Sequence, residues 1–535
     1  MSATTMSGLS TAALLWIFLG AGLAKAQVQE PAKLASNPQK LVTFYAFDDA
    51  QVPAAVRGVG QGALPVKASD GAAWSGSSQG LVRRQPAARI PGDRVQYFSG
   101  RRYLPDDEVQ GIVPDNSGGV WVRTQTGISH IAMVRMSLEK KAAYFEERVK
   151  MRHDRYGLVA SSTLRTPGDL STNQLDPSDN DGLWTAMYAA GECFRYAVTR
   201  SAEALARARR SVEAVLFLEE VTGRPGYPAR SYIRKGDRRG AGGTWVWTAD
   251  GEKEWKADTS SDEIVGHYYI FGIAYDLLPD AGLKRKVAAV TSRMTDHIIG
   301  NGYNLTCIHG QPTYWGRWSK EYFGTRRGKG DGPLNAVELL SFLKTAHHIT
   351  GDARYEQEYR KVANELDYTG LALKLKELRE EINYSDEELA MLPFYLLFRY
   401  EKDPKLLSIY RAALEQWWEN MERERNPLWT FIYQVANPSK KADLGAAVYT
   451  LNRIPMDLRT WSVNNSYRTD MEWEGKPDRF GRRQTRTWLA PDERPVMKWN
   501  GNPFQVNGGN GGRSEDDGAF FLLPYWMGRY HNLIQ

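Results

Sequence analysis

The stretch that decides the fold class spans residues 182–222, GLWTAMYAAGECFRYAVTRSAEALARARRSVEAVLFLEEVT. Apolar residues recur in it at intervals of three and four positions. The first half contains Leu183, Met187, Cys193, Phe194 and Val198, and the second contains Ala204, Val212, Val215, Leu216 and Leu218. This spacing gathers apolar side chains on one helical face, so the stretch predicts two consecutive amphipathic helices.

The same spacing continues on both sides of this pair. It recurs in residues 136–152, 263–278, 283–299, 334–350, 355–382, 387–400, 404–423 and 518–530. Several of these segments begin at helix-capping residues such as Ser261 and Ser385. Gly-rich polar loops are expected at residues 235–258, 325–333 and 500–517.

About ten to twelve helices, paired by alternating short and long loops, favour a mainly α fold. We expect residues 136–535 to form an (α/α) toroid, in which an inner and an outer ring of helices enclose a funnel. The alternative is an α-solenoid. That architecture needs a regular repeat of about 34–45 residues, which this part of the chain lacks.

An internal repeat precedes the helices. Trp74 and Trp121 are 47 positions apart (121 − 74), and Gly80 and Gly127 have the same separation (127 − 80). Short alternating runs between Gly and Asp turns predict strands in both copies, with a period in the range of propeller blades. We therefore expect residues 40–135 to form a small β module with two propeller-like repeats.

The residues of the second copy resemble the two-component-regulator propeller repeat. The similarity rests on Leu104, Pro105, Asp106, Asp107, Glu108, Val109, Ile112, Asp115, Gly119, Trp121 and residues 124–128, and covers about 70 residues. A propeller needs at least four blades, so two copies imply a module packed on the rest of the chain. An ordinary β-meander is the alternative, and it changes nothing about function.

The N-terminus predicts export. Residues 12–23 form an apolar run, and Ala24-Lys25-Ala26 before Gln27 matches a small-residue cleavage site. We expect residues 1–26 to be a signal peptide cleaved after Ala26, which makes the mature protein secreted or periplasmic. A buried helix is the alternative. Since no later stretch is long and apolar enough to span a bilayer, no membrane partner is expected.

Composition narrows the range of partners. The formal net charge of +6 is small, and the basic residues form no long runs, so nucleic acid is a poor candidate. The mild basic balance suits capture of an acidic polysaccharide. The 17 Trp supply both core and aromatic faces for sugar rings. Cys193 and Cys307 predict either one disulfide or two buried thiols, and no Cys/His spacing matches a zinc site.

Acidic residues gather where long loops meet the starts of helices. The four clusters span residues 179–184, 258–263, 383–388 and 515–518. Acids in a first helical turn cap free N–H groups and favour the helix dipole, which is the structural explanation. However, each cluster is followed by aromatic residues, as expected for inner helices that open into a sugar-binding funnel.

Hydrolysis of a glycosidic bond needs two carboxyl groups, one protonated and one ionised. Asp181 and Asp262 are the favoured pair, and Glu263, Asp386 and Glu387 are the reserve candidates. Residues 258–261, Asp-Thr-Ser-Ser, resemble a motif of the unsaturated glucuronyl hydrolases, which are six-hairpin toroids. That resemblance implies a glycoside hydrolase acting on a uronate-containing sugar.

A polysaccharide lyase is the first alternative. Its base removes the proton at C5 of a uronate, and its acid protonates the leaving oxygen. His267 with Tyr268 or Tyr269 could fill these roles, and the architecture and residue types resemble toroid polysaccharide lyases, which use His and Tyr in this way. A structural His267 is the other explanation. A non-catalytic carbohydrate-binding surface protein is the second alternative. Hydrolysis is favoured because acids are abundant and His is scarce, at 8 residues.

The remaining candidates concern binding. Residues 307–319 combine aromatic, basic and turn-forming residues in one loop, which suggests a sugar platform. Its predicted substrate-binding residues are His309, Tyr314, Trp315, Arg317 and Trp318, joined by Trp184 and Tyr269. Arg317 suits a substrate carboxylate. No cofactor motif is present, and residues 179–182 leave a structural calcium site open although an EF-hand is excluded.

Overall fold

The computed structural model describes residues 38–58, 65–240, 242–379, 381 and 383–535. Within these ranges the chain is mostly helical, with sixteen α-helices and several small antiparallel sheets. The expectation of a mainly α protein with a small N-terminal β part is confirmed at this level. The proposed signal peptide lies outside the described residues. None of the helices in these ranges has the length and hydropathy needed to cross a bilayer.

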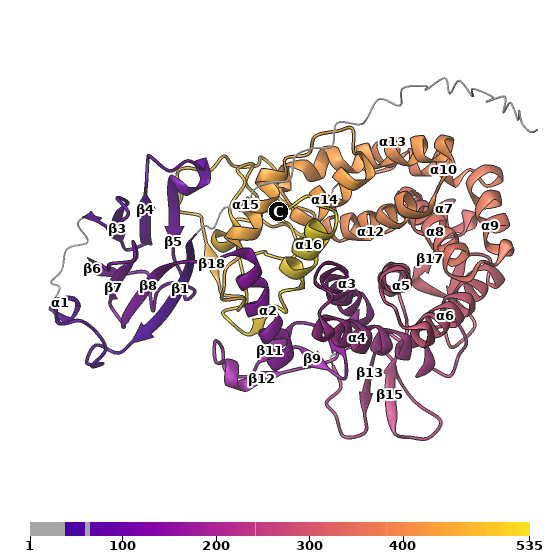
Figure 1. Cartoon of the computed structure of the whole chain (residues 1–535), viewed down its shortest axis with the longest axis horizontal. Coiled ribbons are helices and arrows are strands. Elements are labelled where there is room, and N and C mark those ends of the chain that lie inside the picture. Colours follow the sequence, from indigo (N-terminus) through magenta and orange to yellow (C-terminus); the bar gives the residue numbers. More distant parts are fainter. Residues whose placement is uncertain (1–37, 59–64, 241, 380, 382) are drawn as a thin grey trace, which may run out of the picture.

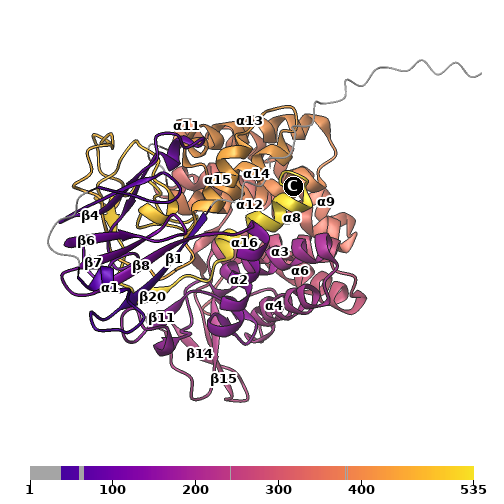
Figure 2. The ribbon, with the colours of Figure 1, turned by 60° about the vertical axis from the view of Figure 1, so that its left-hand side comes forward.

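Two four-stranded sheets form the N-terminal part (Figure 2). One contains β2 (Val66–Lys67), β3 (Ala73–Ser77), β4 (Gly80–Arg84) and β5 (Val95–Phe98) in chain order. The other contains β6 (Val109–Pro114), β7 (Val120–Thr124), β8 (Ile128–Arg135) and, paired with β8, β1 (Pro38–Tyr45). Short helix α1 (Ala54–Arg57) lies between the first two strands in sequence. The second sheet therefore takes its fourth strand from upstream of both repeats.

The two copies of the repeat occupy matching positions in the two sheets. Trp74 lies on β3 and Trp121 on β7, and each strand forms a hairpin with the strand that follows. Trp74, Phe98, Val120 and Ile131 belong to one apolar core shared by both sheets. The repeat period therefore corresponds to one sheet.

Six helices surround the main core, which lies to the right of the sheets in Figure 1. They are α3 (Asp181–Thr199), α5 (Ser261–Leu277), α8 (Gly328–Thr350), α12 (Tyr384–Tyr400), α14 (Pro427–Ala436) and α16 (Ala519–Tyr530). Each contacts the next in this order, and α16 contacts α3 again. Their side chains are buried on most faces, in agreement with a position between the core and a second set of helices.

The second set of helices packs around the first and keeps an exposed face. It consists of α2 (Leu138–Arg152), α4 (Ala202–Glu220), α6 (Ala281–Gly300), α9 (Ala353–Arg360), α10 (Tyr368–Ala372), α13 (Pro404–Met421) and α15 (Leu444–Arg453). Along the chain, members of the two sets alternate, except that α9 and α10 both belong to the second set. The helical part is therefore built largely from consecutive antiparallel helix pairs.

Short elements occupy the connections. They are β9 (Asp154–Arg155), β10 (Leu158–Val159), β11 (Ser162–Leu164), β12 (Asn173–Gln174), β13 (Ser231–Arg234), β14 (Trp245–Trp247), β15 (Lys253–Lys256), β16 (Asn304–Thr306), β17 (Pro312–Arg317), α7 (Lys320–Phe323), α11 (Leu375–Leu378), β18 (Val463–Asn464), β19 (Asn507–Gly508) and β20 (Ser514–Glu515). The expected loop at residues 235–258 thus contains two strands of a three-stranded sheet, and Cys193 and Cys307 are free thiols.

Several expected boundaries were wrong. The predicted loop at residues 325–333 is helical from Gly328 onward, where α8 begins. Only glycine fits at this helix start, since a Cβ atom there would lie 2.1 Å from the Tyr322 carbonyl oxygen. The predicted helix at residues 355–382 breaks into shorter pieces, and Asp367 between them has a left-handed φ of 55°. Helices α14 and α15 were not predicted, since each has only ten residues, fewer than the window over which a helical period can be recognised.

Glycines allow α3 to lie very close to both neighbouring helices. A Cβ atom added at Gly266 on α5 would lie 2.6 Å from the Cα atom of Leu183 on α3. One added at Gly191 on α3 would lie 3.3 Å from the Cα atom of Leu523 on α16. Since packed backbone atoms move little, these two contacts fix how α5, α3 and α16 sit against each other.

We expect Gly266→Ala to destabilise the protein by about 1–3 kcal/mol, because the added methyl group collides with the α3 backbone and overpacks the core. Thermal unfolding followed by circular dichroism measures this effect. Gly300→Ala is the matched control, since nothing lies within 4 Å of a Cβ atom at this last residue of α6. The control is expected to be neutral or slightly stabilising. Equal losses in both variants would contradict the close-packing argument.

Candidate functional site

A cleft of about 700 Å³ opens at the amino-terminal ends of α3, α5, α8 and α12. The backbone N–H groups at the start of a helix favour negative charge, so four such ends make this the natural place for anionic groups. Most of the residues that line the cleft are polar: Asp179, Asn180, Arg230, Ser261, Asp262, Asp331, Asn335, Arg379, Glu381, Asn383, Ser385, Asp386 and Arg479. Trp315, Leu334, Leu378 and Leu389 supply apolar surface.

Asp262 and Asp386 are the two expected catalytic acids that line this cleft. Burial raises the pKa of Asp262, a hydrogen bond from Ser260 opposes the rise, and the negative charge of Asp386 adds to it. Asp386 is paired with Arg379, whose Nη2 atom lies 2.6 Å from its carboxylate. The two carboxyl groups therefore have different environments: Asp262 is buried and its protonated form is favoured, whereas Asp386 is ion-paired with an arginine.

Two arginines add positive charge to the cleft. The side chain of Arg230 has no hydrogen bond or ion pair within the described ranges, and its Nε atom is buried. Its charge lowers the pKa values of Asp262 and Glu263, so it lies within electrostatic range of both. Arg479 is exposed and comes from a distant part of the sequence. Arg230 is thus available to pair with an anionic ligand.

Buried acids lie beneath the cleft. Glu388 on α12 is fully buried, and neither of its carboxyl oxygens has a partner among the described residues. Glu338 on α8 is also buried and accepts a hydrogen bond from Trp318 Nε1 (2.6 Å). Burial raises the pKa of both groups well above the ordinary value, and the charge of Asp262 raises each further. Burial therefore favours the protonated form of both groups.

A second polar group lies where α16 begins. Lys498 Nζ lies 3.3 Å from Asp516 and 2.5 Å from the Ser161 hydroxyl. The same ammonium is 5.0 Å from the centre of the Trp184 ring. The charge of Lys498 also lowers the pKa of Glu388, which connects this group electrostatically to the acids beneath the cleft. Trp184, an expected substrate-binding residue, is partly exposed here.

Asp181 lies outside the cleft lining. Its side chain is almost completely buried, at 1% exposure. It forms an ion pair with Arg155 and accepts hydrogen bonds from Ser178 and Ser231. The carboxylate therefore connects the start of α3 to strands β9 and β13. The neighbouring residues Asp179 and Asn180 face the cleft instead.

The other expected catalytic residues on α5 and α12 are buried between helices. His267 Nδ1 donates to the Glu263 carbonyl oxygen (2.6 Å), and burial lowers the pKa of His267 to about 4. Glu263 accepts from the backbone N–H of Gly182 (3.2 Å). The Tyr268 hydroxyl bonds Thr295 (2.7 Å), and Tyr269 is fully buried. Glu387 is buried beside Glu424, and burial raises its pKa.

The expected sugar platform is the β16–β17 hairpin. Tyr314 and Trp315 are 54% and 50% exposed, and Trp315 lines the cleft. Arg327 lies over both rings, 3.3 Å from the centre of Tyr314 and 4.6 Å from that of Trp315. The hairpin therefore presents an aromatic edge to the cleft.

The other platform candidates have different environments. Arg317 Nε donates to the Thr313 carbonyl oxygen (2.6 Å), so its guanidinium braces the hairpin. Trp318 is buried against Glu338, and His309 is exposed at the turn of the hairpin. Of these three, none lines the cleft.

No sequence pattern marks Arg230, Asp331, Arg379 or Lys498 as functional residues. Asp331 lies in the first turn of α8, inside the stretch expected to be a loop, and it accepts a hydrogen bond from the Tyr322 hydroxyl (2.5 Å). Arg230 and Arg379 precede helix starts by a variable distance, with no local pattern to mark them. No known protein family matches the chain, and no curated protein does either.

Within the described residues no group of three or more His, Cys, Asp or Glu side chains is placed to hold a metal ion.

We expect Glu388→Gln to change how stability depends on pH. The folded state raises the pKa of Glu388 above its ordinary value of 4.5, so wild-type stability falls as pH rises from there toward the raised value. Glutamine has no proton to lose. The melting temperature of the variant minus that of the wild type should therefore increase as the pH is raised from 4.5 to 8. Glu147→Gln, at an exposed residue of α2, is the control. A difference that stays constant with pH would contradict the assignment.

Proposed function

We propose that this protein is a secreted or periplasmic (α/α) toroid enzyme that hydrolyses a glycosidic bond in a uronate-containing oligo- or polysaccharide. The observation that supports it best is the pair of acids Asp262 and Asp386, held in different environments in a cleft at four helix starts. Glycoside hydrolysis requires two carboxyl groups with different protonation states.

The toroid is supported by the order of helix contacts. Helices α3, α5, α8, α12, α14 and α16 contact one another in sequence, and the last contacts the first. The remaining long helices pack around them. An inner ring of helices surrounded by an outer ring has this connectivity, and its inner helix starts place loops at one rim.

In the proposed reaction Asp262 is the general acid. Its raised pKa keeps a proton available, which it transfers to the leaving oxygen as the bond to the anomeric carbon breaks. Asp386 is the general base that takes a proton from the attacking water, and the water oxygen forms the new bond to that carbon. Arg379 forms an ion pair with Asp386 and holds its carboxylate in position for this transfer.

The substrate class follows from Arg230 and the aromatic edge. A guanidinium with no partner of its own is suited to bind a carboxylate through two hydrogen bonds. Trp315 offers an exposed ring at the rim against which the C–H face of a pyranose can pack. Together they favour an acidic sugar over a neutral one.

The position of His267 favours hydrolysis over β-elimination. A lyase base has to reach the C5 proton of the substrate. His267 is fully buried with Nδ1 engaged by Glu263, and no His lines the cleft among the described residues.

We expect Asp262→Asn and Asp386→Asn each to lower kcat by about 10²–10⁴-fold while sugar affinity is kept. The assay follows new reducing ends and the ultraviolet absorbance of unsaturated uronate in parallel, on uronate-rich and neutral polysaccharides. Asp296→Asn, at a half-exposed residue of α6, is the control and should retain wild-type activity. Reducing ends without absorbance support the proposal. A rise in both signals indicates a lyase, and binding without either signal indicates a non-catalytic binder.

We expect Arg230→Gln to raise KM for a uronate-containing substrate about tenfold, because a charge-assisted hydrogen-bond pair is lost. Its kcat should change much less, and any activity on a neutral substrate should keep its KM. Steady-state kinetics on the two substrate classes measure the difference. An equal change of KM on the uronate-containing and the neutral substrate would show that Arg230 does not recognise the carboxylate.

A further inference from the structure

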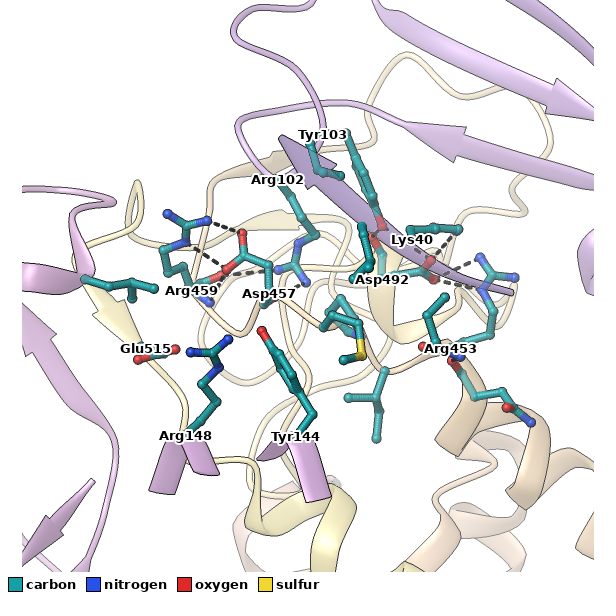
Figure 3. A pocket seen from close by; sticks show the side chains of 18 of the residues that line it. Lys40, Arg102, Tyr103, Tyr144, Arg148, Arg453, Asp457, Arg459, Asp492 and Glu515 are labelled. Atoms are coloured by element: carbon teal, nitrogen blue, oxygen red, sulfur yellow. Dashed lines mark hydrogen bonds and ion pairs between the residues drawn. The ribbon is translucent and has the colours of Figure 1, made fainter. Parts of the chain in front are cut away.

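A separate cavity of about 210 Å³ lies where the β sheets meet the helices. It is bounded by β1, by α2 and by residues 452–459, and it shares no lining residue with the cleft. Figure 3 shows basic side chains entering it from all of these segments. The basic residues that line the cavity are Lys40, Arg102, Arg148, Arg152, Arg453 and Arg459.

Four of these cations have carboxylate partners. Lys40 pairs with Asp492, and Arg453 with Asp492 (2.9 Å) and Glu493 (2.7 Å). Arg152 pairs with Glu515 (2.6 Å) and Arg459 with Asp457 (2.8 Å). Arg102 and Arg148 have no carboxylate within 4.0 Å in the described part of the chain. The cavity therefore has two cations more than its pairs neutralise.

Arg102 is the more constrained of the two. It is 5% exposed and donates to the carbonyl oxygens of Asp457 (3.2 Å) and Arg459 (3.4 Å). Burying a guanidinium that has neutral partners and no counter-charge is unfavourable, and an anion in the cavity would offset that cost. The residue thus points to a ligand of negative charge.

Arg148 and Tyr144 present free polar groups from α2. The Arg148 guanidinium lies 4.4 Å from the centre of the Tyr144 ring, and both side chains rise from α2 into the cavity toward Asp457 and Arg459 (Figure 3). Within the described ranges the Tyr144 hydroxyl makes no hydrogen bond. A guanidinium and a hydroxyl side by side suit the oxygens of a carboxylate or a sulfate group.

We propose that this cavity binds the oxyanion of an acidic sugar residue, a carboxylate or a sulfate ester, between the β1 sheet and α2. The volume of about 210 Å³ is below the roughly 300 Å³ at which pockets for drug-sized ligands begin, so it fits one small anionic group or one sugar unit. The binding of an anion here does not depend on chemistry in the cleft, because the two sites have no residue in common. Only the identification of that anion as part of a sugar rests on the proposed function.

Isothermal titration calorimetry with sodium glucuronate, sodium sulfate and neutral glucose, at constant ionic strength, tests the proposal. All variants carry Arg230→Gln, which weakens anion binding in the cleft. We expect one saturable site for glucuronate or sulfate, none for glucose, and affinity about tenfold or more weaker after Arg148→Gln. Binding of glucuronate alone assigns a carboxylate ligand, and binding of sulfate alone assigns a sulfate ester.

Arg234→Gln is the matched control, since Arg234 also stacks on a tyrosine, 4.0 Å from the centre of Tyr156, and lines neither cavity. It should leave anion affinity unchanged. Tyr144→Phe removes one hydroxyl and keeps the ring, so it should weaken anion binding by a smaller factor than Arg148→Gln. If Arg148→Gln fails to fold, the anion affinity of Tyr144→Phe tests the proposal instead. Absence of saturable anion binding, or equal affinity in the Tyr144, Arg148 and control variants, overturns the proposal.

Discussion

The close packing of α3 against α5 and α16 is the constraint on which the rest of the helical part depends. The Gly266 and Gly191 contacts leave no room for larger residues, so α3 packs in one position between its neighbours. Gly182 extends this constraint to the cleft: its N–H donates to Glu263, and a Cβ atom there would lie 2.0 Å from the same carboxyl. The positions of the helix starts, and so of Asp262, follow from this packing.

Buried acids on the inner helices influence the pKa of the acid that lines the cleft. Glu338 and Glu388 sit where water is excluded, and they are tolerated because the protonated form carries no charge. Since both pKa values are raised partly by Asp262, the three acids influence one another, and each additional negative charge makes the next ionisation harder. Its own burial and the nearby charge of Asp386 thus both favour the protonated form of Asp262.

The sequence predicted the helices better than the site. Apolar spacing located α3, α4, α5, α6 and α13 within a few residues, but α14 and α15 have only ten residues each, fewer than the window over which a helical period can be recognised. Three of the four acid clusters lie at helix starts beside the cleft, and the cluster at residues 515–518 does not line it. The sequence did not show which acid of each cluster faces the cleft. Consecutive residues on a helix point about 100° apart, so Asp262 lines the cleft while Glu263 is buried, and the ring packing decides which is which.

The N-terminal strand connects the β part to the helices physically. Strand β1 pairs with β8 along its full length, and residues on it also reach across to the helical part. Gln39 accepts from Lys141 on α2 (2.8 Å) and donates to the carbonyl oxygen of Asn452 (3.2 Å) in the last turn of α15, while Lys40 pairs with Asp492. One strand thus completes a sheet, fixes that sheet to the helices and lines the basic cavity. Any ligand held there contacts both parts at once, so its binding free energy adds to the cohesion of the junction.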